Sequence, residues 1–149
     1  MTTMTETTTQ VYQLYIRATP EQIWEAITNP DLTAKYFFGG RIELADGRRR
    51  AYGPDGSSWG DEAVIEADPP RRLVHGWSGQ YDPELAAEEP SRVTWEIEPQ
   101  EGGFSKLTLV HDRLEGAPKT AASVAGGWMV VLSGLKTLLE TGEPMASPS

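Results

Sequence analysis

The sequence contains no cysteine and only two histidines. The lack of cysteine excludes disulfide bonds, thiolate metal sites and a cysteine nucleophile. Positive charge is also scarce, because 13 lysine and arginine residues stand against 22 aspartate and glutamate residues, for a net charge of -9. Nucleic-acid binding needs a basic surface that neutralises phosphates, so this balance argues against a nucleic-acid partner. We interpret the only basic run, Arg48–Arg50, as the solvated face of a strand.

Long hydrophobic runs are missing as well, since no apolar stretch approaches the ~18–20 residues of a membrane-spanning helix. The first residues, Met1–Thr9, are polar and lack the basic and apolar regions of a secretory signal. We therefore expect a cytoplasmic protein with no membrane insertion. The length fits a single domain, which we place at residues 10–142 between flexible tails at residues 1–9 and 143–149.

The first third of the sequence predicts a strand followed by two helices. Val11–Arg17 is rich in β-branched and aromatic residues, which is typical of a strand. Thr19 and Gln22 can cap each other across the first helical turn, and Pro20 presets the backbone angle at the first helical position. An Asn-Pro pair ends this helix, and a second short helix is expected over Asp31–Phe37.

Residues 41–112 have the pattern of several antiparallel strands. Asp46-Gly47 is a strong signal for a two-residue hairpin turn. Three later strands alternate, which predicts a sheet with one buried face. The residues assigned to that face are Leu73, His75, Trp77, Val93, Trp95, Ile97, Leu107, Leu109 and His111. The looser stretch Gly79–Pro90 is expected to form a mobile flap.

A long last helix supplies the cover for the buried face. Its apolar residues recur at helical spacing, at Val124, Trp128, Val131, Leu132, Leu135, Leu138 and Leu139. At ~1.5 Å per residue, a helix over Thr120–Glu140 spans roughly 30 Å, enough to cross a sheet. The pattern therefore predicts an α+β fold in which a curved antiparallel sheet wraps around a long C-terminal helix, with two short helices after the first strand.

Several local phrases, in the same order along the chain, resemble those of a known family. They are Tyr15–Trp24 with Ala26–Pro30, Ala67–Val74, Leu107–Asp112, and Gly126–Trp128 leading to Leu135–Gly142. Together they cover essentially Val11 to Gly142. The chain is similar to the SRPBCC (START/Bet v 1-like) superfamily and, within it, to the bacterial branch of the AHSA1 family, named for the activator of Hsp90 ATPase.

The resemblance implies a helix-grip fold with a cavity between the sheet and the C-terminal helix. Relatives in the superfamily bind lipids, sterols, polyketides, flavonoid-like aromatics or plant hormones there, and some are cyclases or hydrolases. The eukaryotic Hsp90 activators combine such a domain with a further N-terminal domain. This sequence has no room for that domain, so we do not expect Hsp90 as a partner.

The candidate ligand-binding residues are those expected to converge where the helix meets the sheet. Apolar walls are assigned to Tyr36, Phe37, Trp77, Trp95, Trp128 and Leu132, and polar anchors to His75 and His111. Both histidines can instead be satisfied core residues, and the indoles can be plain core packing. Gly126, Gly127 and Gly134 in the last helix indicate either close approach to a strand or space for a ligand.

The sequence shows no convincing catalytic constellation and no metal-ligand spacing, so we expect no metal, no cofactor and a monomer by default. The leading functional hypothesis is a carrier or sensor of a small hydrophobic lipid-, polyketide- or flavonoid-like molecule, for example in a stress response. One alternative is a polyketide cyclase- or hydrolase-like enzyme that uses an inward histidine. A second alternative is an Hsp90-associated co-chaperone.

Overall fold

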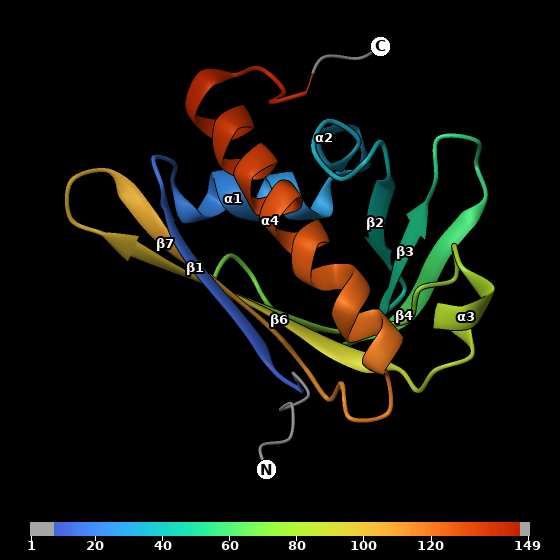
Figure 1. Cartoon of the computed structure of the whole chain (residues 1–149). Helices are drawn as coiled ribbons and strands as arrows, with labels where there is room; N and C mark the ends of the chain where they lie inside the picture. The colour runs from blue at the N-terminus through green and yellow to red at the C-terminus, as the bar shows by residue number, and fades with distance from the viewer. Residues whose placement is uncertain (1–7, 147–149) are drawn as a thin grey trace.

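The computed structural model describes residues 8–146 as one seven-stranded antiparallel sheet crossed by a long helix (Figure 1). The sheet order is β1-β7-β6-β5-β4-β3-β2, so the first strand lies beside the last. The elements are β1 (Gln10–Ile16), α1 (Pro20–Thr28), α2 (Pro30–Thr33), β2 (Arg41–Ala45), β3 (Arg48–Tyr52), β4 (Ser58–Asp68), β5 (Arg72–Trp77), α3 (Pro83–Ala86), β6 (Ser91–Gln100), β7 (Phe104–Asp112) and α4 (Pro118–Thr141). This arrangement confirms the predicted α+β helix-grip fold.

The capping residues set the starts of the two short helices. Gln22 N donates to Thr19 Oγ1 over 3.1 Å, and Thr19 N donates back to Gln22 Oε1 over 2.8 Å. Asn29 then caps α2 by accepting from the amide of Asp31. This second helix ends at Thr33, earlier than the predicted Asp31–Phe37, because the chain turns there and Thr33 Oγ1 donates to the carbonyl of Gly40. Tyr36 and Phe37 therefore lie in the connection to β2.

The hairpins follow the predicted turn chemistry and fix the register of the sheet. Asp46 and Gly47 both have positive φ, 55° and 72°, which is the conformation of a two-residue hairpin turn with native strand twist. On the next pair, β3 and β4, the register places Arg49 opposite Glu62. This pairing decides which charged side chains reach the inner face.

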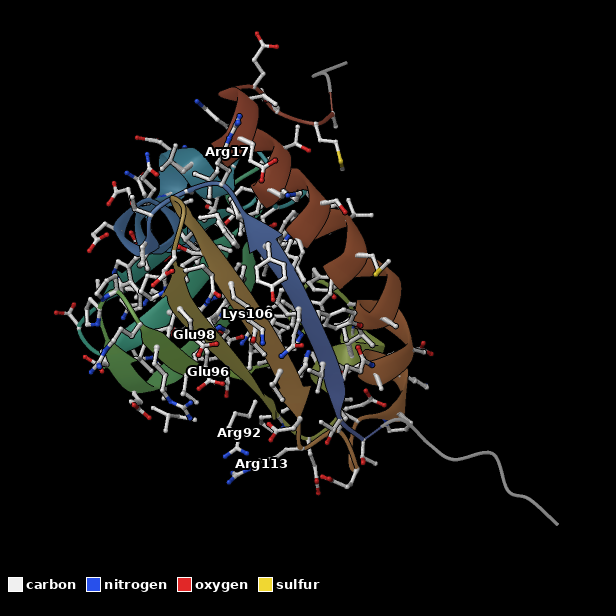
Figure 2. The ribbon with its side chains drawn as sticks, turned by 90° about the vertical axis from the view of Figure 1, so that its left-hand side faces the viewer. Arg17, Arg92, Glu96, Glu98, Lys106 and Arg113 are labelled. Carbon is white, nitrogen blue, oxygen red and sulfur yellow. The ribbon has the colours of Figure 1, made fainter. Side chains whose placement is uncertain are left out.

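Burial confirms the inward positions predicted for β5, β6 and β7, although Val74, Thr94 and Thr108 on the opposite face are buried as well. Leu73, Val93, Ile97, Leu107 and Leu109 are all buried in one cluster under α4. The opposite face carries charge, and Figure 2 shows Arg92, Glu96, Glu98 and Lys106 projecting from it. Glu98 faces Lys106 across β6 and β7.

The helix α4 covers the inner face of the sheet. Its buried residues are Thr120, Ala121, Val124, Trp128, Val131, Leu132, Gly134, Leu135 and Leu138. Gly142, with φ of 81°, ends it in the left-handed conformation that glycine adopts without strain. By length and composition, α4 is long and apolar enough to cross a membrane, which the search of the sequence for long apolar runs did not indicate. The core helix of a soluble protein meets the same criterion. In this structure α4 supplies buried residues to the hydrophobic core beneath it.

The segment Gly79–Pro90, predicted as a flap, is tied to α4. It contains α3, whose Leu85 is buried. The carboxylate of Glu88 accepts hydrogen bonds from the amides of Lys119 and Thr120 at 2.9 and 2.8 Å. These bonds satisfy amides in the first turn of α4, where no N-cap side chain does so. Of the predicted tails at residues 1–9 and 143–149, residues 1–7 and 147–149 lie outside the described residues, and residues 8–9 and 143–146 form no helix or strand.

Candidate functional site

A pocket of about 350 Å³ lies between the first half of α4 and strands β2 to β5. The helix part contributes Ser123, Val124, Gly127, Trp128 and Val131. The remaining lining residues are Phe37, Phe38, Ile42, Arg49, Ala51, Trp59, Gly60, Glu62, Trp77, Ser78 and Tyr81. Most of these side chains are apolar or aromatic, and ligand pockets of this size range have that composition.

An aromatic cluster forms the inner wall of the pocket. The Trp77 and Trp128 rings lie 5.3 Å apart, and Phe37 packs edge-on against Trp128 at 6.0 Å. Elsewhere in the lining, Trp59 and the exposed Tyr81 make a T-shaped pair at 6.2 Å. Such tilted and edge-on geometries are the favourable ones for aromatic pairs. The pocket therefore offers flat apolar surfaces on more than one side.

Glycine makes room for the indole of Trp59. A Cβ atom at Gly53 would lie 2.5 Å from Trp59 Nε1, and one at Gly40 would lie 2.9 Å from Trp59 Cζ3. Both distances are below any ordinary contact, so these two positions admit the ring only because they lack a side chain. The sequence left the orientation of Trp59 open, and the structure places it on the pocket wall.

Two charged residues of opposite sign lie among these apolar walls. Arg49 of β3 and Glu62 of β4 are both buried, and the closest guanidinium and carboxylate atoms, Nη1 and Oε2, are 3.9 Å apart. The guanidinium carbon lies 5.4 Å from the Trp77 ring centre and 5.9 Å from that of Phe37. The neighbouring Arg48 and Arg50 lie on the other face, where both pair with Asp61.

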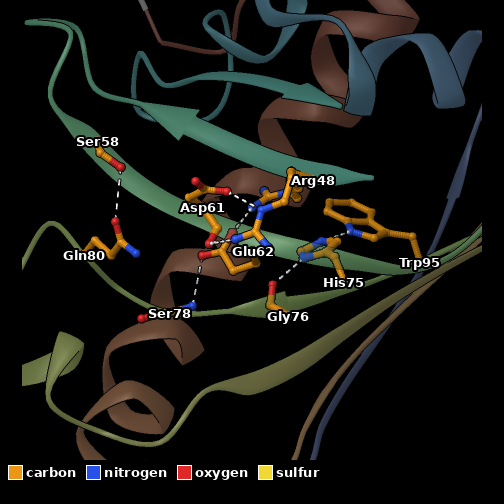
Figure 3. Close-up of polar contacts among 10 residues, drawn as sticks. Arg48, Ser58, Asp61, Glu62, His75, Gly76, Ser78, Gln80 and Trp95 are labelled. Carbon is orange, nitrogen blue, oxygen red and sulfur yellow. Dashed lines mark hydrogen bonds and ion pairs between the residues drawn. The ribbon is translucent and has the colours of Figure 1, made fainter. Parts of the chain in front are cut away.

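Glu62 is held by the backbone that directly follows β5. Its Oε1 accepts a hydrogen bond from the amide of Ser78 at 3.1 Å (Figure 3). Its Oε2 is buried without a hydrogen-bond partner among the described residues. Burial raises the pKa of the carboxyl to about 7, against the opposing influence of Arg49. Near neutral pH, the group is therefore present in both the protonated and the ionised form.

The two histidines are fully used by the protein core. Trp95 Nε1 donates to His75 Nε2 at 3.0 Å, and His75 Nδ1 lies 2.7 Å from the carbonyl of Gly76 (Figure 3). Trp128 Nε1 donates to His111 Nδ1 at 3.0 Å, and His111 Nε2 lies 2.7 Å from Ser91 Oγ. Burial lowers the pKa of His75 far below its usual value and that of His111 to about 4. Both rings are therefore neutral at physiological pH.

The eight predicted site residues divide into two groups. Three of them, Phe37, Trp77 and Trp128, line the pocket. The other five are core residues outside its lining, namely Tyr36, His75, Trp95, His111 and Leu132. The histidines were expected to anchor a ligand, but both nitrogens of each ring already have protein partners. Tyr36 likewise uses its hydroxyl, which donates to the carbonyl of Ala26 at 2.7 Å.

Arg49 and Glu62 were not among the predicted site residues. The basic run was interpreted as one solvated face, and this was wrong for its middle member, because strand alternation turns Arg49 inward. The signal available in the sequence was parity: Arg49 and Ala51 share a face, as do Gly60 and Glu62, and hairpin pairing sets the two strands opposite each other.

The glycines of α4 allow both close packing and open space for a ligand. A Cβ atom at Gly134 would lie 3.1 Å from Tyr36 Cβ, so this glycine permits close approach, to the α2–β2 connection and not to a strand. A Cβ atom at Gly126 or Gly127 would meet open space, and Gly127 lines the pocket. No cluster of potential metal ligands occurs among residues 8–146.

The family model for activator of Hsp90 ATPase homolog 1-like proteins, AHSA1, matches residues 17–140. This chain belongs to the AHSA1 family. Solved structures agree with the helix-grip architecture of this AHSA1 protein. A search of curated proteins finds no match.

Three structural neighbours illustrate the range of proteins that share this fold. CalU16 from Micromonospora echinospora is 22% identical, with a TM-score of 0.68, over 94% of this chain and 77% of CalU16. The Aha1 protein of Colwellia psychrerythraea, solved as a dimer, is 20% identical with a TM-score of 0.70, over 90% and 97% of the two chains. PFC0360w, an HSP90 activator from Plasmodium falciparum, is 18% identical with a TM-score of 0.71, over 89% and 96%. At these identities the likeness establishes the AHSA1 fold alone.

Proposed function

We propose that this protein binds a small, flat, apolar molecule in the pocket between α4 and strands β2 to β5, as a carrier or sensor in the cytoplasm. The observation that supports this most is the pocket itself. About 350 Å³ stays open beside a densely packed core, and its walls are aromatic. Leaving such walls exposed to water sacrifices hydrophobic stabilisation, which a bound apolar ligand restores.

The position of the indoles supplies a direct assay. Trp59, Trp77 and Trp128 all line the pocket, so ligand entry should change the intrinsic fluorescence. A panel of flavonoids, fatty acids and aromatic polyketides should yield at least one compound that saturates this signal. The same compound should shift the amide resonances of pocket residues in β3, β4 and the first half of α4. A panel with no saturable response would remove the proposal.

Two adjacent glycines provide a matched test of location. Gly127→Leu places a side chain in the pocket. Gly126→Leu adds the same side chain at an exposed position outside the pocket lining. Both replace glycine inside a helix, so both should raise the free energy of unfolding by up to ~1 kcal/mol. Only Gly127→Leu should weaken ligand binding. Equal affinities in the two variants would place the ligand elsewhere.

The histidine-based enzyme receives no support from this geometry, because His75 and His111 have no nitrogen left for a substrate. Association with Hsp90 is addressed by a separate measurement. We expect the protein to leave the ATPase rate of bacterial Hsp90 unchanged, and a stimulated rate would favour the co-chaperone instead.

A further inference from the structure

Arg49 is a buried cation that faces the pocket with almost no protein partner. Its side chain is 4% exposed, and it makes no hydrogen bond with the described residues. Its single ion pair within residues 8–146 is with Glu62, and the 3.9 Å between the two charged groups is beyond hydrogen-bonding distance. A guanidinium carries five N–H donors, and a nearly buried one that meets no protein acceptor leaves those donors free for a ligand in the pocket. The aromatic rings of Phe37 and Trp77 flank the charge but supply no lone pair.

A second unused donor lies beside the guanidinium. Trp77 Nε1 is buried without a hydrogen-bond partner among the described residues, and its ring is the one 5.4 Å from Arg49. Both residues line the same pocket. Unused donors on two adjacent side chains call for a ligand group that only accepts hydrogen bonds. A carboxylate meets this requirement and also matches the planar fork of arginine.

We infer that Arg49 binds the carboxylate of a flat apolar ligand whose hydrocarbon part occupies the aromatic walls of the pocket. This inference rests on the proposed ligand-binding function and narrows its ligand class to acids. Glu62 then acts as the internal counter-charge of Arg49 when the pocket holds no ligand. A bound carboxylate takes over that role.

The other ionisable groups around Arg49 and Glu62 do not add a net charge to the buried site. Tyr36 faces Arg49, but burial raises its pKa and its hydroxyl proton is committed to Ala26. His75 is neutral, because burial lowers its pKa. Asp61 and Arg48, next to Glu62 and Arg49 in sequence, pair with each other on the outer face.

Binding of a carboxylate to Arg49 should therefore be coupled to the uptake of a proton by Glu62. With Glu62 ionised, the ligand would place a second negative charge in the same buried site. With Glu62 protonated, Arg49 and the ligand neutralise each other. Because the carboxyl titrates near pH 7, ligand affinity should fall above that pH, by up to about tenfold for each pH unit.

The first experiment compares 2-naphthoate with its neutral isostere 2-naphthamide, by tryptophan fluorescence and calorimetry. The wild-type protein should prefer the acid by at least about tenfold at pH 6.5, the size expected of a charge-assisted hydrogen bond. Arg49→Met should remove this preference, because it should lower the affinity for the acid by at least about tenfold more than that for the amide. Arg49→Lys keeps the charge but loses the fork, so it should retain only part of the preference.

The second experiment uses Glu62→Gln, which keeps Arg49 intact and serves if Arg49→Met does not fold. Wild-type affinity for 2-naphthoate should drop at least about tenfold from pH 6.5 to 8.5, while the probe itself stays ionised. The affinity of Glu62→Gln should be flat over this range. Calorimetry in buffers of different ionisation enthalpy should record proton uptake in the wild type at pH 7.5 and none in Glu62→Gln.

The outcomes separate this inference from the function on which it rests. Equal binding of acid and amide, or an acid preference that survives Arg49→Met, overturns the acidic ligand class while pocket binding stands. Loss of all binding in Gly127→Leu but not Gly126→Leu would still locate such ligands in the pocket. Failure of both naphthyl probes overturns the acid inference, and failure of the panel of flavonoids, fatty acids and aromatic polyketides as well overturns both.

Discussion

Trp128 Nε1 on α4 donates a hydrogen bond to His111 Nδ1 on β7 over 3.0 Å. An equivalent bond joins Trp95 to His75, but it ends on the other ring nitrogen, Nε2. An indole N–H can only donate, so each histidine must accept at the nitrogen that faces its tryptophan. The two rings therefore hold opposite tautomers, with the proton on Nδ1 in His75 and on Nε2 in His111.

This difference between the histidines can be observed directly. Long-range ¹H–¹⁵N spectra at pH 7 should show His75 with a protonated Nδ1 and His111 with a protonated Nε2. Averaged signals for either ring would contradict the hydrogen-bond assignment. Because both pKa values are lowered by burial, neither ring should become cationic between pH 8 and 6.

The two tryptophans that donate to these rings form a matched pair for mutation. Trp128→Phe and Trp95→Phe each leave one buried histidine nitrogen without its donor, which should reduce the free energy of unfolding by about 1–3 kcal/mol. Only Trp128 lines the pocket, so only Trp128→Phe should also alter ligand affinity. Urea unfolding and fluorescence titration measure the two effects separately. A ligand affinity that responds to Trp95→Phe would contradict the boundary of the pocket.

His111 should make the fold sensitive to acid. Burial lowers its pKa from 6.5 to about 4, so the unfolded chain takes up a proton before the folded one does. Its stabilising contribution is complete above pH 6.5 and is lost as pH falls through about 4, by about 3 kcal/mol. Urea unfolding at several pH values should therefore give a shallower acid loss for His111→Gln than for the wild type. Identical slopes would show that His111 titrates normally.

Glu62 should act with the opposite sign. Burial raises its pKa from 4.5 to about 7, so the folded protein holds the proton more tightly than the unfolded chain. Its contribution is complete below pH 4.5 and is lost as pH rises through about 7, again by about 3 kcal/mol. Relative to the wild type, Glu62→Gln should thus gain stability between pH 5 and 8. A constant difference between the two proteins across this range would contradict the raised pKa.

The sequence predicted those parts of the fold that depend on local rules. The capping pair Thr19 and Gln22, the turn at Asp46-Gly47 and the stripe of α4 each have one stable solution, and all three are confirmed. Long-range hydrogen bonds are different, because no local pattern indicates that the Glu88 carboxylate caps a helix about 30 residues further along. Such contacts arise only once the sheet has brought the two segments together.

The candidate site was predicted only in part, for a physical reason. Strand parity identified His75 and His111 as inward residues. It does not indicate which inward residues line a pocket and which pack against other core residues. That depends on how α4 lies over the sheet, and here its first half stands over the pocket. Arg49 was overlooked because three consecutive arginines suggest a uniform exposed face, whereas alternation separates the middle one from its neighbours.

The contact between Gly134 and Tyr36 has a consequence for the shape of the pocket. Gly134 lies further along α4 than Trp128, whose indole fixes the middle of the helix to β7. A bulkier residue at position 134 would wedge the far end of the helix outward while that bond holds its centre. The helix would then tilt about Trp128, and the distance between its first half and strands β3 and β4 would change. We therefore expect a larger residue at position 134 to change the width of the pocket, although Gly134 does not line it.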